Sequence, residues 1–230
     1  MNSEDMIYWH EGVLCCNERW EAAYNRFESP EQERRKFRQR FEWLGIGDLP
    51  RETQIVDLFC GSGNGLIALH EMGFHRLTGV DLSPELLARA PGYATRIVAD
   101  CTDLKFAEDS VDAFMVQGGL HHLPRIPDDV EKCLDSVLRS LRPGGYFFVV
   151  EPWETLFLKL VHGVTSFPPA RKLVPKFDAF ATMIEEESTT YRSWLSQPEA
   201  IREAVEARYV VVREQVSEGK WMAILKKAPA

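Results

Sequence analysis

A loop with three glycines directly follows an apolar run, and it is the feature of the sequence best suited to chemistry. Residues 55–65 read IVDLFCGSGNG, with Gly61, Gly63 and Gly65 at alternate positions. Because glycine has no Cβ, such a loop lets the backbone approach a ligand closely, and a helix that begins there offers its free N–H groups. Several kinds of nucleotide-binding protein share such a loop, so it predicts a nucleotide-like ligand without identifying it.

Three carboxylates narrow the choice of ligand. The glycine spacing leaves Leu66 where a dinucleotide fingerprint has its third glycine, and Asp57 beside the loop would repel a pyrophosphate. An acid at that position suits a ligand that carries an ammonium and a sulfonium group. Asp81 could accept both hydroxyls of a ribose, and Asp100 could accept a hydrogen bond from an adenine amino group. A cationic adenosine cofactor is therefore favoured, and an oxidoreductase with a nicotinamide cofactor is disfavoured.

The elements around these residues read as an α/β fold. Between residues 53 and 151, short apolar runs alternate with helical periods, which is typical of a parallel, doubly wound sheet. Strands are predicted at residues 53–58, 76–81, 94–98, 111–116 and 145–150, with helices after Gly63, Ser83 and Pro127. A helix over residues 198–207 leads to a hairpin with strands at 209–212 and 221–225. The glycine loop and Asp81 then follow two strands and meet at the carboxyl edge of the sheet, where ligands bind.

Two segments lie outside this alternation. Residues 1–46 repeat apolar positions at steps of three and four from Trp9 onward, which predicts a pair of helices that caps the sheet. The basic residues from Arg34 to Arg40 lie largely off that apolar stripe and are expected to face solvent. Residues 152–196 form an insertion rich in aromatic residues. The sequence predicts a lid over an apolar acceptor, to which Tyr8, Trp9, Trp153 and Phe157 would contribute.

The net charge and the number of cysteines limit the kinds of partner and the cellular location to expect. The 27 Lys and Arg against 35 Asp and Glu give a net charge of −8, which disfavours a nucleic-acid partner. The five cysteines form no C-x-x-C pair, so we expect reduced thiols in a cytoplasmic protein, with no disulfide framework and no metal site. No stretch approaches the ~20 apolar residues that span a bilayer, so no membrane anchor is expected. The oligomeric state stays open.

Five segments together resemble a known family. IVDLFCGSGNG, TGVDLSPELL, VADCTDL, AEDSVDAFMVQGGLHHL and LRPGGYFFVVEPW resemble the successive motifs of class I S-adenosylmethionine-dependent methyltransferases, most of all the small-molecule branch that includes ubiquinone and menaquinone biosynthesis enzymes. The resemblance covers about residues 45–152, and Phe59 departs from it where many members have glycine. It implies a Rossmann-like, mostly parallel sheet of seven strands with an antiparallel last strand and helices on both faces. We expect an N-terminal helical cap over residues 1–46 and a methyltransferase domain over 47–230, with the lid-like insertion at about 152–196.

The resemblance also implies which residues bind S-adenosylmethionine. The methionine portion would be held by Asp57, Gly61 and Gly63, the ribose by Asp81, one adenine face by Leu82, the adenine amino group by Asp100 and the amino-acid end by Gln117. Ser62 and Cys101 stand beside these positions and are counted with them.

The catalytic candidates are His121, His122 and Glu151, which follow the fourth and fifth predicted strands. Methyl transfer is an in-line displacement, so the protein chiefly aligns the acceptor, and a base helps if the acceptor is a phenol. Each of the three could instead have a structural role. We predict transfer to an oxygen or a carbon of a small aromatic or lipophilic molecule. A protein amine as acceptor, or a non-catalytic protein that binds S-adenosylmethionine, are the alternatives.

Overall fold

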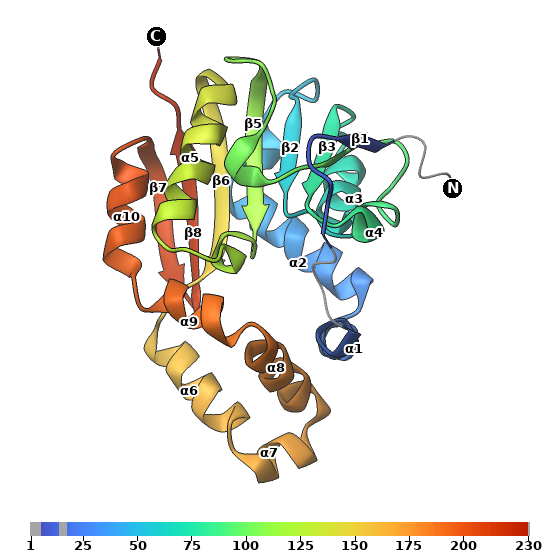
Figure 1. The fold of residues 1–230 in the computed structure, drawn as a ribbon, viewed down its shortest axis with the longest axis vertical. Coiled ribbons are helices and arrows are strands. Elements are labelled where there is room, and N and C mark those ends of the chain that lie inside the picture. Colours follow the sequence, from blue (N-terminus) through green and yellow to red (C-terminus); the bar gives the residue numbers. More distant parts are fainter. Residues whose placement is uncertain (1–5, 14–17, 230) are drawn as a thin grey trace.

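The computed structural model describes residues 6–13 and 18–229 of the chain, so Cys15 and Cys16 lie outside the described residues. Within them, the strands form one sheet in the order β1-β4-β3-β2-β5-β6-β8-β7 (Figure 1). Their bounds are Met6–Tyr8 (β1), Ile55–Leu58 (β2), Leu77–Asp81 (β3), Thr95–Val98 (β4), Val111–Gln117 (β5), Leu141–Pro152 (β6), Val210–Ser217 (β7) and Lys220–Lys226 (β8).

The direction of the strands agrees with the prediction, but their number does not. Strands β1 to β6 pair in parallel, and β8 lies antiparallel between β6 and β7. The predicted mostly parallel sheet with an antiparallel last strand is therefore confirmed. The expected number of seven strands is wrong, because Met6–Tyr8 adds an eighth beside β4 in the described residues. A three-residue edge strand held by backbone hydrogen bonds leaves no periodicity in the sequence to detect.

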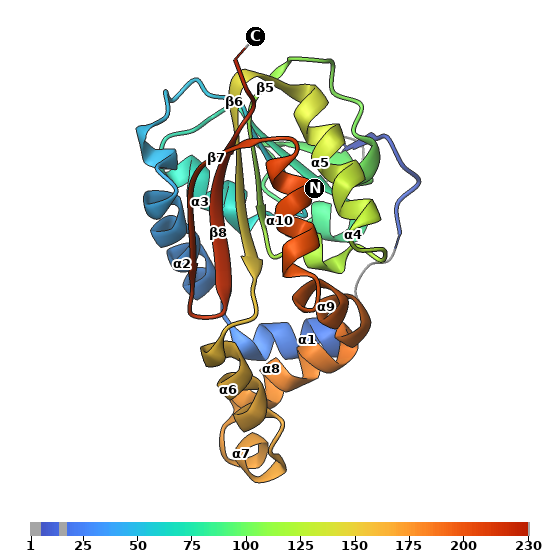
Figure 2. The ribbon, with the colours of Figure 1, turned by 90° about the vertical axis from the view of Figure 1, so that its left-hand side faces the viewer.

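Two layers of helices bury the two faces of the sheet, as Figure 2 shows. On one side lie α2 (Pro30–Trp43) and α3 (Asn64–Glu71), and on the other lie α5 (Asp128–Ser140) and α10 (Pro198–Glu206). Helix α5 turns an apolar face to the core, where Val130, Leu134 and Val137 are fully buried. The short helix α4 (Pro84–Leu87) follows Ser83 as the sequence predicts, and the Ser83 side chain caps it by accepting from Leu86 N–H.

The N-terminal segment is only partly helical. Helix α1 (Glu18–Phe27) and α2 confirm the predicted pair, and Ser29 begins α2 with a reciprocal hydrogen-bond pair to Gln32. The prediction of helix from Trp9 is wrong for the residues before the gap: Trp9 N–H donates to Val98 O, and Val13 N–H donates to Leu82 O. Trp9 packs against the core there, whereas Tyr8 and Val13 are exposed.

The insertion is a helical unit at the carboxyl end of the sheet. It contains α6 (Leu156–Thr165), α7 (Pro168–Leu173), α8 (Pro175–Glu186) and α9 (Ser188–Leu195). Helices α1 and α8 lie together across that end, while α6 and α7 form the far end of the molecule (Figures 1 and 2). Trp194 links this unit to the sheet: its buried indole N–H donates a hydrogen bond to Pro152 O, at the end of β6, at 2.7 Å. No helix in the described part of the chain is long and apolar enough to cross a membrane.

Candidate functional site

Asp81 and the glycine loop meet at the carboxyl edge, as the sequence predicts. One carboxylate oxygen of Asp81 accepts from Gly61 N–H at 2.8 Å, and the other accepts from Ser83 N–H at 2.9 Å. Burial raises the pKa of Asp81, and these backbone donors oppose the rise. Gly61 has a φ of +52°, and no atom lies within 4 Å of the place where its Cβ would stand. The loop is thus held by Asp81 and leaves open space on its own backbone.

Asp57 lies beneath the loop as a buried acid. It is 4 % exposed, and its pKa is raised well above the ordinary value by burial and, to a lesser extent, by the charges of Asp81 and Glu33. A Cβ on Gly65 would stand 2.5 Å from Asp57 Oδ2, so glycine at that position makes room for the carboxylate. A cationic group placed beside Asp57 would stabilise its charged form, and this is the chemistry that a sulfonium or ammonium supplies.

The other residues predicted to contact adenosine differ in how accessible their side chains are. Asp100 Oδ1 accepts from the N–H and the hydroxyl of Thr102, both at 2.8 Å, and so caps the short turn Cys101–Asp103. Leu82 and Ser62 are partly exposed at the same edge. The Cys101 side chain is buried in the core cluster with Cys133, so only its backbone could reach a ligand.

Gln117 ends β5 and carries an unsatisfied donor. Its Oε1 accepts from Arg40 Nη1 at 3.2 Å, whereas its Nε2 is buried with no hydrogen-bond partner among the described residues. Burial lowers the pKa of Arg40, and nearby acids oppose this. The prediction that Arg40 faces solvent is wrong. Its position three residues after Phe37 and directly before Phe41 is the signal that places it on the inner face of α2.

A second group of polar side chains ties the N-terminal helices to the glycine loop. Asn64, the first residue of α3, donates to Glu33 Oε2 at 2.6 Å, and the Tyr24 hydroxyl donates to Glu33 Oε1. Burial raises the pKa of Glu33 and that of Tyr24. The sequence reasoning missed all three residues: Tyr24 and Glu33 belong to no motif, and Asn64 stands in the glycine loop but was not singled out there.

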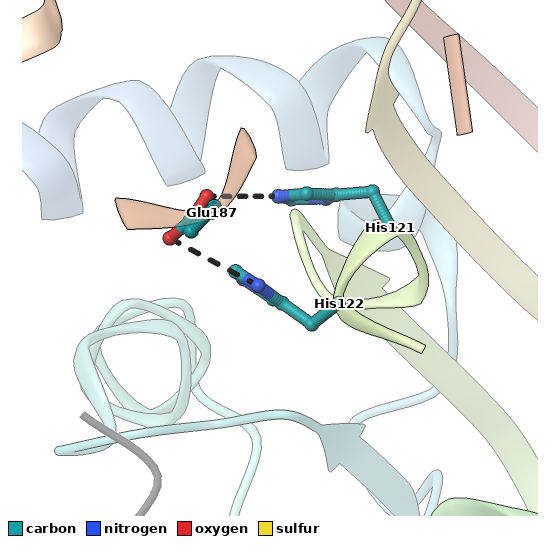
Figure 3. Close-up of side chains that lie close together, drawn as sticks. All are labelled: His121, His122 and Glu187. Atoms are coloured by element: carbon teal, nitrogen blue, oxygen red, sulfur yellow. Dashed lines mark ion pairs between the residues drawn. The ribbon is translucent and has the colours of Figure 1, made fainter. Parts of the chain in front are cut away.

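The catalytic candidates do converge, together with a residue that the sequence reasoning missed. Glu151 is buried, and its Oε1 accepts from the N–H groups of Gly119 and Leu120, each at 2.8 Å. Its Oε2 lies 2.8 Å from His121 Nδ1. Glu187, between α8 and α9, completes the cluster: its oxygens lie 3.7 Å from His121 Nε2 and 3.9 Å from His122 Nδ1 (Figure 3).

The two histidines of this cluster have opposite protonation behaviour. Burial alone would lower the pKa of His121, but its contacts with Glu151 and Glu187 outweigh burial and raise it to about 9. For His122, burial and the charge of His121 lower the pKa to about 4. At neutral pH His121 is therefore a cation between two carboxylates, and His122 is a neutral imidazole that can accept a proton.

The same cluster is the place where a metal could bind. Among the described residues, His121, His122 and Glu187 offer ligand atoms that lie within 4.8 Å of one another. Two imidazoles and a carboxylate form a set that Zn²⁺ accepts in enzymes. Without a metal, protonated His121 supplies one positive charge between the carboxylates of Glu151 and Glu187. The geometry admits a divalent ion without requiring one, so the expected absence of a metal site stays a prediction.

The aromatic residues predicted to form a lid do not lie together in the structure. Trp153 is buried and packs against Trp194 and Trp221, and Trp9 packs edge-on against Phe106, so the prediction is wrong for Trp153 and Trp9. Phe157 and Tyr8 are exposed. An aromatic ring that does lie beside the histidines is that of Tyr191 in α9, whose centroid lies 5.8 Å from that of His121.

Comparison with known proteins supports the same interpretation of the central segment. Residues 56–149 match the family model of a methyltransferase domain. The chain is 30 % identical over 143 residues to a demethylmenaquinone methyltransferase of Bacteroides fragilis, covering 55 % of this chain and 56 % of that protein. It is 32 % identical over 121 residues to a 2-methyl-6-phytyl-1,4-hydroquinone methyltransferase of Synechocystis, covering 49 % and 36 %. The match thus spans about half of the first relative's length.

Solved structures agree on the fold. The PH0226 protein of Pyrococcus horikoshii superposes with a TM-score of 0.65 at 16 % identity, covering 92 % of this chain and all of that one (100 %). An S-adenosylmethionine-dependent methyltransferase of Mesorhizobium loti gives a TM-score of 0.54 at 19 % identity, covering 81 % and 97 %. Residues 56–149 thus resemble a methyltransferase domain, and the predicted resemblance of this chain to class I S-adenosylmethionine-dependent methyltransferases is confirmed.

Proposed function

We propose that this protein is an S-adenosylmethionine-dependent methyltransferase that transfers a methyl group to an oxygen or a carbon of a small aromatic or lipophilic molecule. The observation that carries the proposal is the junction of Gly61 with Asp81 at the carboxyl edge, directly above buried Asp57. The quinone and hydroquinone methyltransferases among its relatives support the acceptor class. The proposal keeps residues 1–46 as a cap, 47–230 as the methyltransferase domain and 152–196 as a lid-like insertion.

The donors and acceptors of the site fit this cofactor. Asp57 offers a buried carboxylate to its cationic groups, and Asp81 and Asp100 offer acceptors to its ribose and adenine. The buried amide of Gln117 and the guanidinium of Arg40 together suit the carboxylate of its methionine portion. Leu82 would contact the adenine, and the backbone from Gly61 through Ser62 to Gly63, with that of Cys101, would line the rest. The bound cofactor supplies a methyl group on a positively charged sulfur, which an acceptor displaces in line.

The histidine cluster handles the proton that the acceptor loses. An oxygen acceptor gives up a hydroxyl proton, and a carbon acceptor gives up a ring proton after transfer. His122, neutral at physiological pH, takes this proton on its imidazole. His121 is already protonated, so it acts by positioning: its ring lies tilted beside that of His122, with 4.1 Å between the centroids, and it is held by Glu151.

The proposal includes a cytoplasmic location and a small-molecule acceptor in place of a nucleic acid. The free thiols of Cys60, Cys101 and Cys133 support a reducing, cytoplasmic location. The net charge of −8 supports a small-molecule acceptor over a nucleic acid.

Calorimetry with S-adenosylhomocysteine tests the cofactor site. We expect the wild type to bind and Asp81→Ala to bind more weakly by about 1–3 kcal/mol, the usual range for a lost charged hydrogen bond. Glu85→Ala is the matched control, since this acid lies on the next helix with its side chain 60 % exposed and pairs only at the surface with Arg89. Equal affinity in Asp81→Ala and wild type, or affinity for NAD without affinity for S-adenosylhomocysteine, would contradict the proposal.

The acceptor is tested with radiolabelled S-adenosylmethionine. We expect label to pass to a panel of hydroquinones and phenols and not to polypeptides with free amines. Transfer to polypeptides alone would favour the protein-amine alternative, and cofactor binding without transfer to any acceptor would favour a non-catalytic binding protein.

A further inference from the structure

The insertion exposes a stripe of large apolar side chains. On α6, Leu156 and Leu160 are 86 % and 67 % exposed, and Phe157 and Val164 flank them at 53 % and 39 %. Leu156, Leu160 and Val164 are four residues apart and therefore share one face of the helix. The opposite face already packs inward through Leu158, so the exposed stripe is additional to what the fold needs.

The stripe continues beyond α6. Phe167 is 59 % exposed and Leu173 81 %, and Val174 is also exposed. We call the side chains of Leu156, Phe157, Leu160, Val164, Phe167, Leu173 and Val174 the apolar end. It lies on α6, α7 and their flanks, at the extremity of the molecule (Figures 1 and 2). Single exposed apolar residues are ordinary, whereas a group of them gathered on two neighbouring helices indicates a contact surface.

The charged side chains around the apolar end are mostly basic, although Lys159 is paired with Glu154 at 2.8 Å. Residues 155–177 contain Lys159, Arg171, Lys172 and Lys176 and no aspartate or glutamate, in a chain whose net charge is −8. Arg171 is paired with Asp178 and Glu185, but Lys172 and Lys176 are exposed beside Leu173. Apolar side chains interspersed with lysines are the pattern of a segment that lies in the interface of an anionic membrane.

We propose that the apolar end docks on an anionic lipid surface, with α6 and α7 at the level of the headgroups. A second copy of the chain suits this surface poorly, because a twofold contact would bring the same lysines of both copies together. Docking would also place the lipid next to the unit that supplies Glu187 to the histidine cluster. This inference goes beyond the proposed function and does not depend on it, since binding to lipid is measured without any acceptor.

Vesicle sedimentation with the full chain tests the proposal. We expect the protein to sediment with vesicles of phosphatidylglycerol and phosphatidylcholine and much less with phosphatidylcholine alone. The double variant L156S/L160S should bind at least about tenfold more weakly, because two large apolar side chains are lost from the interface. Lys172→Glu should weaken binding roughly fivefold or more, and more so at low salt.

A matched control separates docking from general surface hydrophobicity. Val210 and Val212 of β7 are 54 % and 53 % exposed at the opposite side of the chain's fold, so V210S/V212S should bind vesicles like the wild type. Thermal unfolding checks that each variant remains folded. Absence of wild-type binding to anionic vesicles, or equal binding by L156S/L160S, would overturn the proposal. So would a dimer, seen by light scattering, that L156S/L160S dissolves while vesicle binding is absent.

Discussion

At the level of single residues, the neighbours of two adjacent histidines shift their pKa values in opposite directions. His121 lies between Glu151 and Glu187, which raise its pKa, so it keeps its proton. Burial and the positive charge of His121 lower the pKa of His122, which is therefore neutral. Two neighbouring groups whose pKa values are pushed apart can take different roles in one reaction. The sequence singled out both histidines but could not distinguish them, because Glu187 comes from an insertion whose docking no local pattern encodes.

The raised pKa of His121 predicts a stability that depends on pH. Because its folded-state pKa of about 9 exceeds the ordinary 6.5, its contribution is fully present below pH 6.5 and is lost as pH rises toward 9. We expect the free energy of unfolding to fall by about 1–3 kcal/mol over this window from this group. In Glu187→Gln the free energy of unfolding should fall less over this window. In Glu186→Gln, a change at the neighbouring residue, it should fall as much as in the wild type. Urea titrations across the window measure this, and parallel curves for all three proteins would refute it.

The lowered pKa of His122 predicts its part in turnover. His122→Gln should reduce the methyl-transfer rate by roughly 10²–10⁴-fold, the usual contribution of a general base, with cofactor affinity unchanged. In the wild type the rate should decline as pH falls toward about 4, and the variant should lack this limb. His75→Gln, at an exposed position, is the control. Wild-type turnover in His122→Gln would leave alignment of the acceptor as the whole mechanism.

At the level of elements, predictability follows how locally each element is encoded. The β2 strand, the loop after it and α5 carry their own signals: an apolar run, glycines, and the buried set that includes Val130 and Val137. Strand β1 has no signal of its own, since Met6–Tyr8 is defined by its pairing with β4. Arg40 is an intermediate case: its spacing from Phe37 places it on the inner face of α2, but its partner Gln117 is defined only once α2 lies against the end of β5.

The start of α3 predicts a strict need for glycine. Gly65→Ala would place a methyl group 2.5 Å from Asp57 Oδ2 and force this buried carboxylate to move. We expect affinity for S-adenosylhomocysteine to fall at least about tenfold, as expected when a charged contact is displaced. Gly163→Ala is the matched control within a helix, because no atom lies within 4 Å of its added Cβ. It should stabilise the protein by about 0.5–1 kcal/mol without changing affinity, and equal affinities in both variants would contradict this reading of Asp57.

At the level of the whole molecule, the N-terminal helices and the sheet are linked through the site. Glu33 of α2 accepts from Asn64 at the start of α3, and Arg40 of α2 donates to Gln117 at the end of β5. Helix α1 in turn packs on α8 of the insertion, and an exposed ion pair joins Arg26 to Asp178. The two outlying segments therefore contact each other across the carboxyl edge, where the cofactor and acceptor would bind.

This arrangement predicts that cofactor binding orders α2 more than it orders the far face of the sheet. Hydrogen exchange should slow in α2 and at the start of α3 when S-adenosylhomocysteine is added, because a ligand held by Gln117 and Arg40 would satisfy polar groups at the base of α2. Asn64→Ala should reduce the slowing in α2, since it removes the bond to Glu33. Helix α10, which packs on α5 on the face of the sheet opposite α2, provides the internal reference. If α10 slowed as much as α2, the ligand would be stabilising the whole fold by mass action, and the N-terminal helices would have no particular connection to the site.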